Sequence, residues 1–214
     1  AILLKDVVQR HRIRNVDFLE RLALFLAENV GSLVSARSIS KYLKSQQVNV
    51  SHNLVLDYLD HLCNAFLVFK ARRSDIAGKK VFEIGVKYYF EDLGLRHSLI
   101  GYRATDISKV LENVVYLHLL MAGYDVTVGK MEGREVDFVC RKAGERIYVQ
   151  VTYVVADDEV REREFGNLLA IDDNYPKYVV SMDEAAGGTY KGVRHIHVEE
   201  FVHSLGTEGG RLPP

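Results

Sequence analysis

The chain has 214 residues, of which 48% are hydrophobic and 27% are charged, a balance typical of a globular protein in water. Its apolar runs are well short of the roughly 18 residues that a membrane-spanning helix needs, so we expect no membrane partner. The net charge of −1 hides an asymmetry, because residues 1–110 sum to +6 and residues 111–214 sum to −7. A basic half joined to an acidic half indicates two units with different partners.

The chain starts at Ala1 rather than at a Met and lacks the pattern of a signal peptide, so we interpret it as a piece of a longer cytoplasmic protein. Cys63 and Cys140 lie in apolar surroundings without metal-site spacing, and we expect two buried free thiols in a reducing compartment. In "HIH", His195 and His197 fall on one face of a predicted strand. Without a third ligand in the pattern, a surface or edge-strand pair is the better interpretation.

The first half predicts three helices and a hairpin. Apolar residues at helical spacing run from Asn15 onward, again through "SARSISKYLKSQ", and again after Ser51, which is a predicted N-cap. Two strands, "FLVFKARR" and "KKVFEIG", follow around a turn at Gly78. This is the order of a winged helix-turn-helix domain, which we place at 15–86 after an N-terminal extension over 1–14.

A winged helix presents its third helix to a major groove and its hairpin to phosphates. The side chains that suit DNA or RNA at these places are Lys41, Lys44, His52, Asn53, Lys70, Arg72, Arg73, Lys79 and Lys80. The five cations of the hairpin are enough for several phosphate contacts. Asp57 and Asp60 on the third helix would repel a DNA backbone, and winged helices also bind proteins, so both roles stay open.

A connector of aromatic and turn residues over 87–104 leads to an α/β domain at 105–204, and we expect a disordered tail at 205–214. The predicted elements of this domain are a helix, three strands, a helix and a strand, with a short strand and a helix added at the end. The fold class is therefore mixed α/β. Glu112 is unusual, because a carboxylate on a helix that is apolar nearly all round needs a partner, a metal or a route to water.

The second and third strands of this domain, "REVDFVC" and "ERIYVQV", form a predicted hairpin. With a loop at 142–145, Arg141 lies opposite Arg146, and paired residue numbers sum to 287. Asp137 and Gln150 then face each other at about 5 Å between Cβ atoms. A bulge or a shorter turn would shift this register.

Alternation along these strands assigns their side chains to two faces. Asp137, Gln150 and Thr152 are predicted on one face, and Val136 and Phe138 on the other. A polar row on a buried strand is the feature that most suggests a site in this half of the chain.

This order of elements, with an acid in the first helix, "VDF" on one strand and a polar pair on the next, resembles the PD-(D/E)XK nuclease superfamily. The resemblance implies a restriction-endonuclease-like αβββαβ fold in which two acids hold Mg²⁺ and a Lys stabilises charge or orients water. It assigns Asp137 to the Asp position, Gln150 to the second acidic position and Thr152 to the Lys position. Glu112 matches the helix acid, so Asp137 and Glu112 are the residues left to hold a metal.

The segments "ENVVYLHLLMAGYDV", "GREVDFV" and "REREFGNLLAIDDNYPKYVVSMD" look like the C-terminal region of a family of bacterial and archaeal AAA+-type ATPases. In that family an ATPase precedes a winged helix and a nuclease-like domain of unknown function. The resemblance runs from about Leu4 to Val202 and implies that an ATPase domain outside this chain is its partner. No GxxxxGK[ST] phosphate loop occurs in the sequence, so we do not expect this chain to bind ATP.

Gln150 offers a neutral amide and Thr152 offers no positive charge, and both departures weaken Mg²⁺-dependent phosphodiester hydrolysis. A replacement cation would have to come from Lys130, Arg161 or Arg163. The leading hypothesis is a nucleic-acid-binding, regulatory region with an inactive nuclease-like domain. The alternatives are a Mg²⁺-dependent nuclease with an Asp–Gln–Thr site and a protein-interaction scaffold that joins subunits of an oligomer or other proteins.

Overall fold

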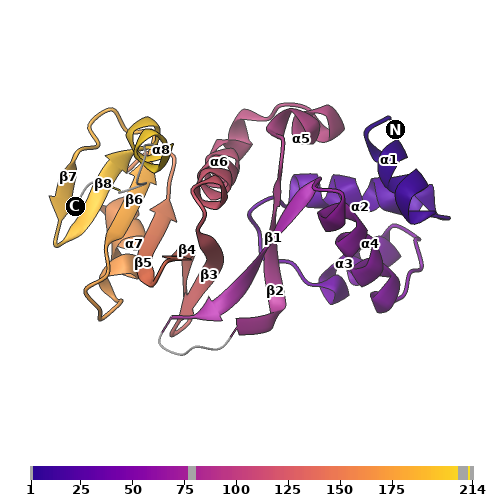
Figure 1. The fold of residues 1–214 in the computed structure, drawn as a ribbon, viewed down its shortest axis with the longest axis horizontal. Coiled ribbons are helices and arrows are strands. Elements are labelled where there is room, and N and C mark those ends of the chain that lie inside the picture. The colour runs from indigo at the N-terminus through magenta and orange to yellow at the C-terminus, as the bar shows by residue number, and fades with distance from the viewer. Residues whose placement is uncertain (1, 77–80, 207–211, 213–214) are drawn as a thin grey trace. The chain divides into compact units, whose positions relative to one another are not determined.

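The computed structural model describes residues 2–76, 81–206 and 212, which form the mixed α/β chain that the sequence predicts (Figure 1). Contacts divide the chain into two compact units. Unit 1 comprises Ala1–Ala71 and Ile84–Ala104, and unit 2 comprises Arg72–Glu83 and Thr105–Pro214. Strands β1 (Val68–Asp75) and β2 (Val81–Phe90) therefore contribute residues to both units.

Unit 1 follows the predicted order of three helices and a hairpin, with one more helix at each end. Its helices are α1 (Ile2–His11), α2 (Val16–Glu28), α3 (Ala36–Ser45), α4 (His52–Asn64) and α5 (Leu93–Ile100). The sequence interpretation had an extension where α1 lies and a connector where α5 lies. Of the predicted hairpin cations, Lys79 and Lys80 lie outside the described residues.

Side-chain caps begin the three predicted helices. Asn15 Oδ1 accepts an N–H of the first turn of α2 at 3.0 Å, and Ser51 Oγ does the same for α4 at 3.2 Å. Ser35 and Ser38 form a reciprocal capping box at the start of α3. These bonds satisfy backbone donors that a helix leaves unpaired at its start, which is why each helix begins where it does.

An antiparallel bridge between Val34 and Val86 attaches the end of β2 to the helical part of unit 1. The Val34 N–H donates to Val86 O at 2.8 Å, and the Val86 N–H donates to Val34 O at 2.9 Å. Both side chains are buried, as are those of Phe18, Leu22 and Ile39 in the same unit. Since Val34 immediately precedes α3, this pair adds a short third strand beside the hairpin, which the sequence did not predict.

Unit 2 has the predicted αβββαβ order. After a 3₁₀ turn at Ala104–Asp106, its elements are α6 (Ile107–Met121), β3 (Asp125–Met131), β4 (Arg134–Lys142), β5 (Glu145–Val151), α7 (Asp158–Leu169), β6 (Lys177–Ser181), β7 (Gly188–Tyr190), β8 (Val193–His197) and α8 (Val198–Gly206). The tail expected at 205–214 lies mostly outside the described residues, and its first two residues end α8.

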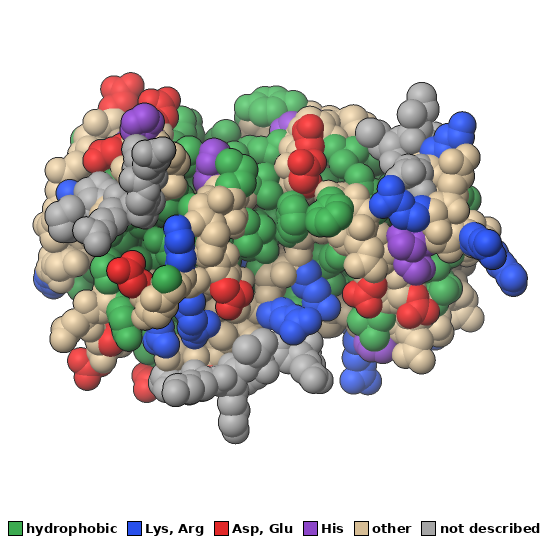
Figure 2. Space-filling model, viewed as in Figure 1, with side chains coloured by type: hydrophobic (Ala, Val, Ile, Leu, Met, Phe, Trp, Pro, Cys, Tyr) green, Lys and Arg blue, Asp and Glu red, His purple; other side chains and the backbone are tan. Residues whose placement is uncertain are grey.

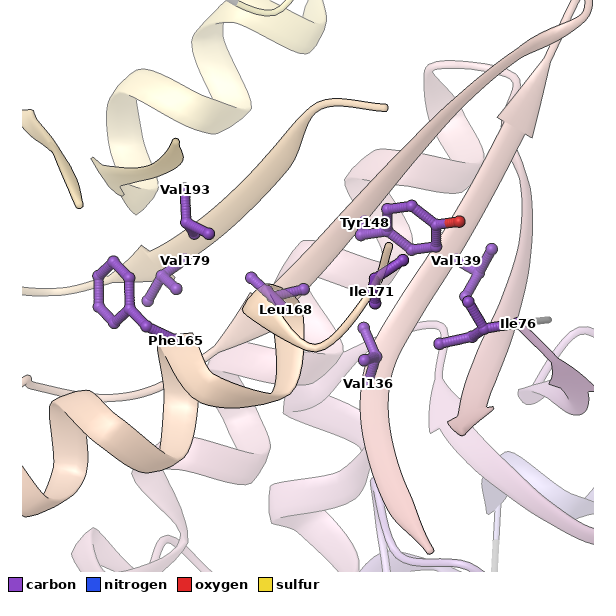
Figure 3. Packing of buried hydrophobic residues seen from close by; sticks show 9 residues of the cluster. All are labelled: Ile76, Val136, Val139, Tyr148, Phe165, Leu168, Ile171, Val179 and Val193. Carbon is purple, nitrogen blue, oxygen red and sulfur yellow. The ribbon is translucent and has the colours of Figure 1, made fainter. Parts of the chain in front are cut away.

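The strand order is β2-β1-β3-β4-β5-β6-β8-β7. The β3–β4 and β4–β5 pairs are antiparallel, whereas the β5–β6 and β6–β8 pairs are parallel, so the sheet is mixed. Helix α6 covers one face through Tyr116, whose ring centroid lies 5.7 Å from that of Phe138. Helix α7 covers the other face, where Phe165 and Leu168 pack on Tyr148 and Val179 (Figure 3).

Strands β4 and β5 pair in the predicted register. Phe138 lies opposite Val149, and Arg141 lies opposite Arg146. The two-residue turn between the strands has positive φ at Ala143 and at Gly144, as a tight hairpin requires.

A bulge distorts β4 on its other edge, where it pairs with β3. Thr127 pairs with Val139 and Gly129 pairs with Val136, so three steps along β4 oppose two steps along β3. Val136 consequently joins Val139 in the cluster under α7, while Phe138 contacts α6. The prediction that Val136 shares a face with Phe138 is wrong for this reason.

Both cysteines are free thiols, as predicted, although only Cys140 is fully buried. Burial raises the pKa of the half-buried Cys63 thiol to about 11 and the pKa of Cys140 well above its ordinary value. Both side chains are therefore protonated at neutral pH, and their role is to pack. Among the described residues, the helices lack the length and apolar character needed to cross a bilayer.

Candidate functional site

A row of buried polar side chains lies on the α7 face of the sheet in unit 2. Each is at most 7% exposed, and its members are Asp137, Gln150, Thr152, Glu164 and Ser181. A buried polar group lowers stability unless it has hydrogen-bond partners, so the partners of this row indicate what it can do.

Gln150 is at the centre of the row and bonds to the backbone of Asp137 and to the carboxylate of Glu164. Its Oε1 accepts the Asp137 N–H at 3.3 Å, and its Nε2 donates to Glu164 Oε2 at 3.0 Å. Asp137 Oδ2 in turn accepts the Val151 N–H at 3.0 Å. The β4–β5 ladder ends at Phe138 and Val149, so beyond that pair the two strands are held by these side-chain bonds. The structure thus brings Asp137 and Gln150 together.

Glu164 is the member of the site that sequence reasoning missed. Its Oε1 accepts two hydrogen bonds from Arg163, at 3.0 Å from Nε and 2.7 Å from the terminal nitrogen. The Glu164 side chain is 9% exposed, whereas that of Arg163 is 66% exposed, so the guanidinium covers the carboxylate from the solvent side. A signal existed, because Glu164 precedes Phe165 and stands four residues before Leu168, which places it on the inward stripe of α7.

We call this network closed, because both of its carboxylates accept hydrogen bonds from other groups of the protein. Asp137 is bonded by a backbone N–H, and Glu164 is bonded by an amide and by a guanidinium. Among the described residues, no group of three or more His, Cys, Asp or Glu side chains is arranged to hold a metal ion. Glu112, the predicted helix acid, is half-buried on α6, the helix that covers the opposite face of the sheet. Hydrogen bonds from the protein and the charge of Arg163 therefore compensate these buried carboxylates.

Thr152 lies at the end of β5 and continues the pairing with β6, since its N–H donates to Val180 O at 3.0 Å. Its hydroxyl cannot supply the positive charge of a lysine. Of the cations considered as replacements, Arg163 bonds to the Gln150 network, and it does so through Glu164.

A second polar group on the same face contains a histidine. Ser181 Oγ lies 2.7 Å from His195 Nε2, and it accepts the Asp183 N–H at 3.1 Å. Burial lowers the pKa of His195, Asp183 acts in the opposite direction, and Arg161 adds to the lowering. A neutral imidazole can then accept the Ser181 O–H. Because β8 has neighbours on both sides, the edge-strand interpretation of His195 is wrong.

The predicted nucleic-acid contacts of unit 1 are solvent-exposed where they are described. They comprise Lys41 and Lys44 on α3, His52 and Asn53 in the first turn of α4, and Lys70 on β1. Asp57 and Asp60, also exposed, lie further along α4.

Two further predicted contacts, Arg72 and Arg73, belong to unit 2, where Arg72 is exposed and Arg73 is half-buried. On the face of the molecule drawn in Figure 2, cationic and anionic side chains intermingle rather than separate.

Comparison with known proteins places half of the chain in a described family model and finds two longer relatives. Residues 1–106 match the model of a domain of unknown function (DUF8612). An uncharacterized protein of Haemophilus influenzae is 38% identical over 202 residues, which cover 94% of this chain and 50% of that protein. An uncharacterized protein of Methanocaldococcus jannaschii is 26% identical over 168 residues, covering 77% of this chain and 37% of that protein.

The chain thus spans half or less of the length of these curated relatives. No solved structure matches it significantly.

Proposed function

We propose that this chain is a nucleic-acid-binding, regulatory region of a longer cytoplasmic protein, in which unit 2 keeps a nuclease-like fold without cutting. The observation that carries the proposal is the closed network around Gln150. Metal-assisted hydrolysis needs carboxylate oxygens that face a metal and a water. Here the oxygens of Asp137 and Glu164 accept hydrogen bonds from the protein itself.

The arrangement of unit 1 supports the binding part of the proposal. The three capped helices, the hairpin and the Val34–Val86 bridge have the order of a winged helix. Lys41 and Lys44 stand three residues apart on α3, so they share one exposed side of that helix. The greater length of the relatives is consistent with a partner domain outside this chain, and the resemblance to AAA+-type proteins implies that this domain is an ATPase.

Binding to a short DNA duplex, measured by fluorescence anisotropy over a salt series, tests the proposal. We expect affinity to fall steeply with salt, because each phosphate contact contributes about 0.9 to the slope of log K against log salt. The double variant Lys41→Ala/Lys44→Ala should weaken binding and lower that slope by about 2.

The matched control is Lys5→Ala, which removes an exposed lysine from α1 and should leave binding unchanged. No binding at low salt, or equal binding by the double variant and the wild type, would contradict the proposal and favour a protein-interaction scaffold.

One observation favours a second candidate function, a Mg²⁺-dependent nuclease. Glu164 brings a carboxylate to Gln150, at the place where the sequence lacks its second acid. Single-stranded and plasmid DNA should then be cleaved with Mg²⁺ or Mn²⁺, and the cleavage should vanish in Asp137→Ala and in Glu164→Gln. Equal, negligible cleavage by all three proteins would exclude this function and leave the binding proposal intact.

A further inference from the structure

Two surface hollows of unit 2 meet at Tyr175. They lie near the N-terminal end of β5, whereas Gln150 is near its C-terminal end. One has a volume of 250 Å³ and lies against the β4–β5 turn, and the other has a volume of 360 Å³ and lies between the ends of α7 and the turn before β8. Tyr175 lines both hollows, and its side chain is 42% exposed. We name this surface the Tyr175 groove and define it by Arg141, Lys142, Arg146, Tyr175, Lys177 and Lys191.

The Tyr175 groove is a positive patch in the acidic half of the chain. Five cationic side chains line it against two carboxylates, Glu145 and Asp173, although residues 111–214 together carry a charge of −7. One of the carboxylates is already used, because Lys177 Nζ lies 3.1 Å from Asp173 Oδ1. Of the remaining cations, Arg141, Lys142 and Arg146 line one of the two hollows that Tyr175 shares and Lys191 lines the other, which favours an anionic ligand that extends across Tyr175.

The aromatic ring at the centre of the groove is held in place. The Arg146 guanidinium lies 5.1 Å from the ring centroid of Tyr175 and donates to Tyr148 Oη at 3.1 Å. That hydroxyl donates to Asp173 Oδ2 at 2.6 Å, and Asp173 Oδ1 accepts the Tyr175 N–H at 3.2 Å. A platform that is fixed before binding loses little entropy when a ligand stacks on it.

We propose that the Tyr175 groove binds single-stranded nucleic acid, with a base stacked on Tyr175 and phosphates held by Lys142 and Lys191 on either side of the ring. Aromatic platforms flanked by cations are how proteins bind unpaired strands, since every base offers a flat face and every step offers a phosphate. A duplex buries its base faces and cannot use the ring. An acidic peptide would use the cations but gain nothing from an exposed tyrosine between them.

This site is separate from the exposed lysines of α3, so it goes beyond the proposed function. The two can be tested independently of each other. It is also separate from the Gln150 network. Arg146 and Gln150 are four residues apart on β5, which corresponds to about 13 Å along the strand.

Binding of a labelled thymidine oligonucleotide of about 12 nucleotides to the whole chain, in EDTA and at low salt, tests the inference. We expect Tyr175→Ala to weaken binding about fivefold or more, since stacking on one aromatic ring contributes on the order of 1 kcal/mol or more. Tyr175→Phe keeps the ring and should bind within about twofold of the wild type. Tyr102→Ala, which removes a more exposed tyrosine from unit 1, is the matched control and should bind like the wild type.

Three results would overturn the inference. The first is an unchanged oligonucleotide affinity in Tyr175→Ala with the native circular dichroism spectrum. The second is competition by thymidine monophosphate at the same concentration as the oligonucleotide, which would mean a mononucleotide site. The third is competition by polyglutamate of equal charge, which would mean that only the cations matter. Duplex binding that survives in Tyr175→Ala supports two separate sites.

Discussion

Gln150 determines what the α7 face of unit 2 can do, because an amide both donates and accepts. Its Nε2 donates to Glu164 while its Oε1 accepts the Asp137 N–H, and a carboxylate at this position could do only the second. A glutamate there would set two carboxylates in contact and would need a proton or a cation between them. The amide therefore satisfies Glu164 without a proton or a cation between two carboxylates.

His195 gives the site a dependence on pH. Burial lowers its pKa in the folded chain, so the unfolded chain binds a proton more readily as the pH falls below about 6.5. The folded state should accordingly lose stability as the pH falls through that range, since burial of the imidazole disfavours its charged form. Asp183 opposes this effect and Arg161 reinforces it.

We expect His195→Gln to remove this part of the pH dependence. In urea unfolding, the free energy of unfolding of the wild type should drop more between neutral pH and about pH 5 than that of the variant. His203→Gln removes an exposed histidine from α8 and is the control, which should keep the wild-type dependence. Parallel curves for wild type and His195→Gln would show that His195 is not the group responsible.

At the scale of the elements, the sequence predicted the features that depend on residues close together in the chain, such as helix starts and a hairpin turn. The caps at Ser35 and Ser51 and the two-residue turn at Ala143 and Gly144 are short-range signals, and this turn sets the β4–β5 register. The bulge opposite Gly129 has no such signal, because it arises from how β4 meets β3 rather than from residues beside it. Glu164 does have a local signal, its place on the inward stripe of α7, but its partner Gln150 comes from another element and the sequence does not show the pair.

Next to the bulge, Gly129 lies where the structure leaves no room for a side chain. A Cβ at this position would lie 2.8 Å from Ile76 Cδ1 and 2.8 Å from Val139 Cγ2, both in the packed core of unit 2. Gly129→Ala should therefore lower the free energy of unfolding by about 1–3 kcal/mol, as overpacking does in other cores.

Gly166 provides the opposite case within the same unit. It lies inside α7, and a Cβ there would meet no atom within 4 Å. Gly166→Ala should raise the free energy of unfolding by about 0.5–1 kcal/mol, because alanine restricts the unfolded chain without a clash. Urea unfolding of both variants measures the contrast, and shifts of the same sign would contradict the packing described for Gly129.

At the scale of the whole molecule, the charge balance indicates two units but does not locate their sites. The acidic half carries the Tyr175 groove, and the basic half carries exposed acids on α4 beside its lysines. Two models of polyanion binding follow. In one, the net charge of the chain attracts any nucleic acid, and in the other, each unit has a local site with its own preference.

Two pairs of lysine variants, each measured with a duplex and with a single strand, separate these models. With local sites, Lys41→Ala/Lys44→Ala should weaken duplex binding alone, and Lys142→Gln/Lys191→Gln should weaken single-strand binding alone. The quadruple variant should then match the relevant pair for each probe, because sites without shared partners act additively to within about 0.5 kcal/mol. If net charge governs, both pairs should weaken both probes equally, since each removes the same two charges. That result would replace two specific sites with one diffuse attraction, and the salt slope would fall by the same amount in both pairs and by about twice that amount in the quadruple variant.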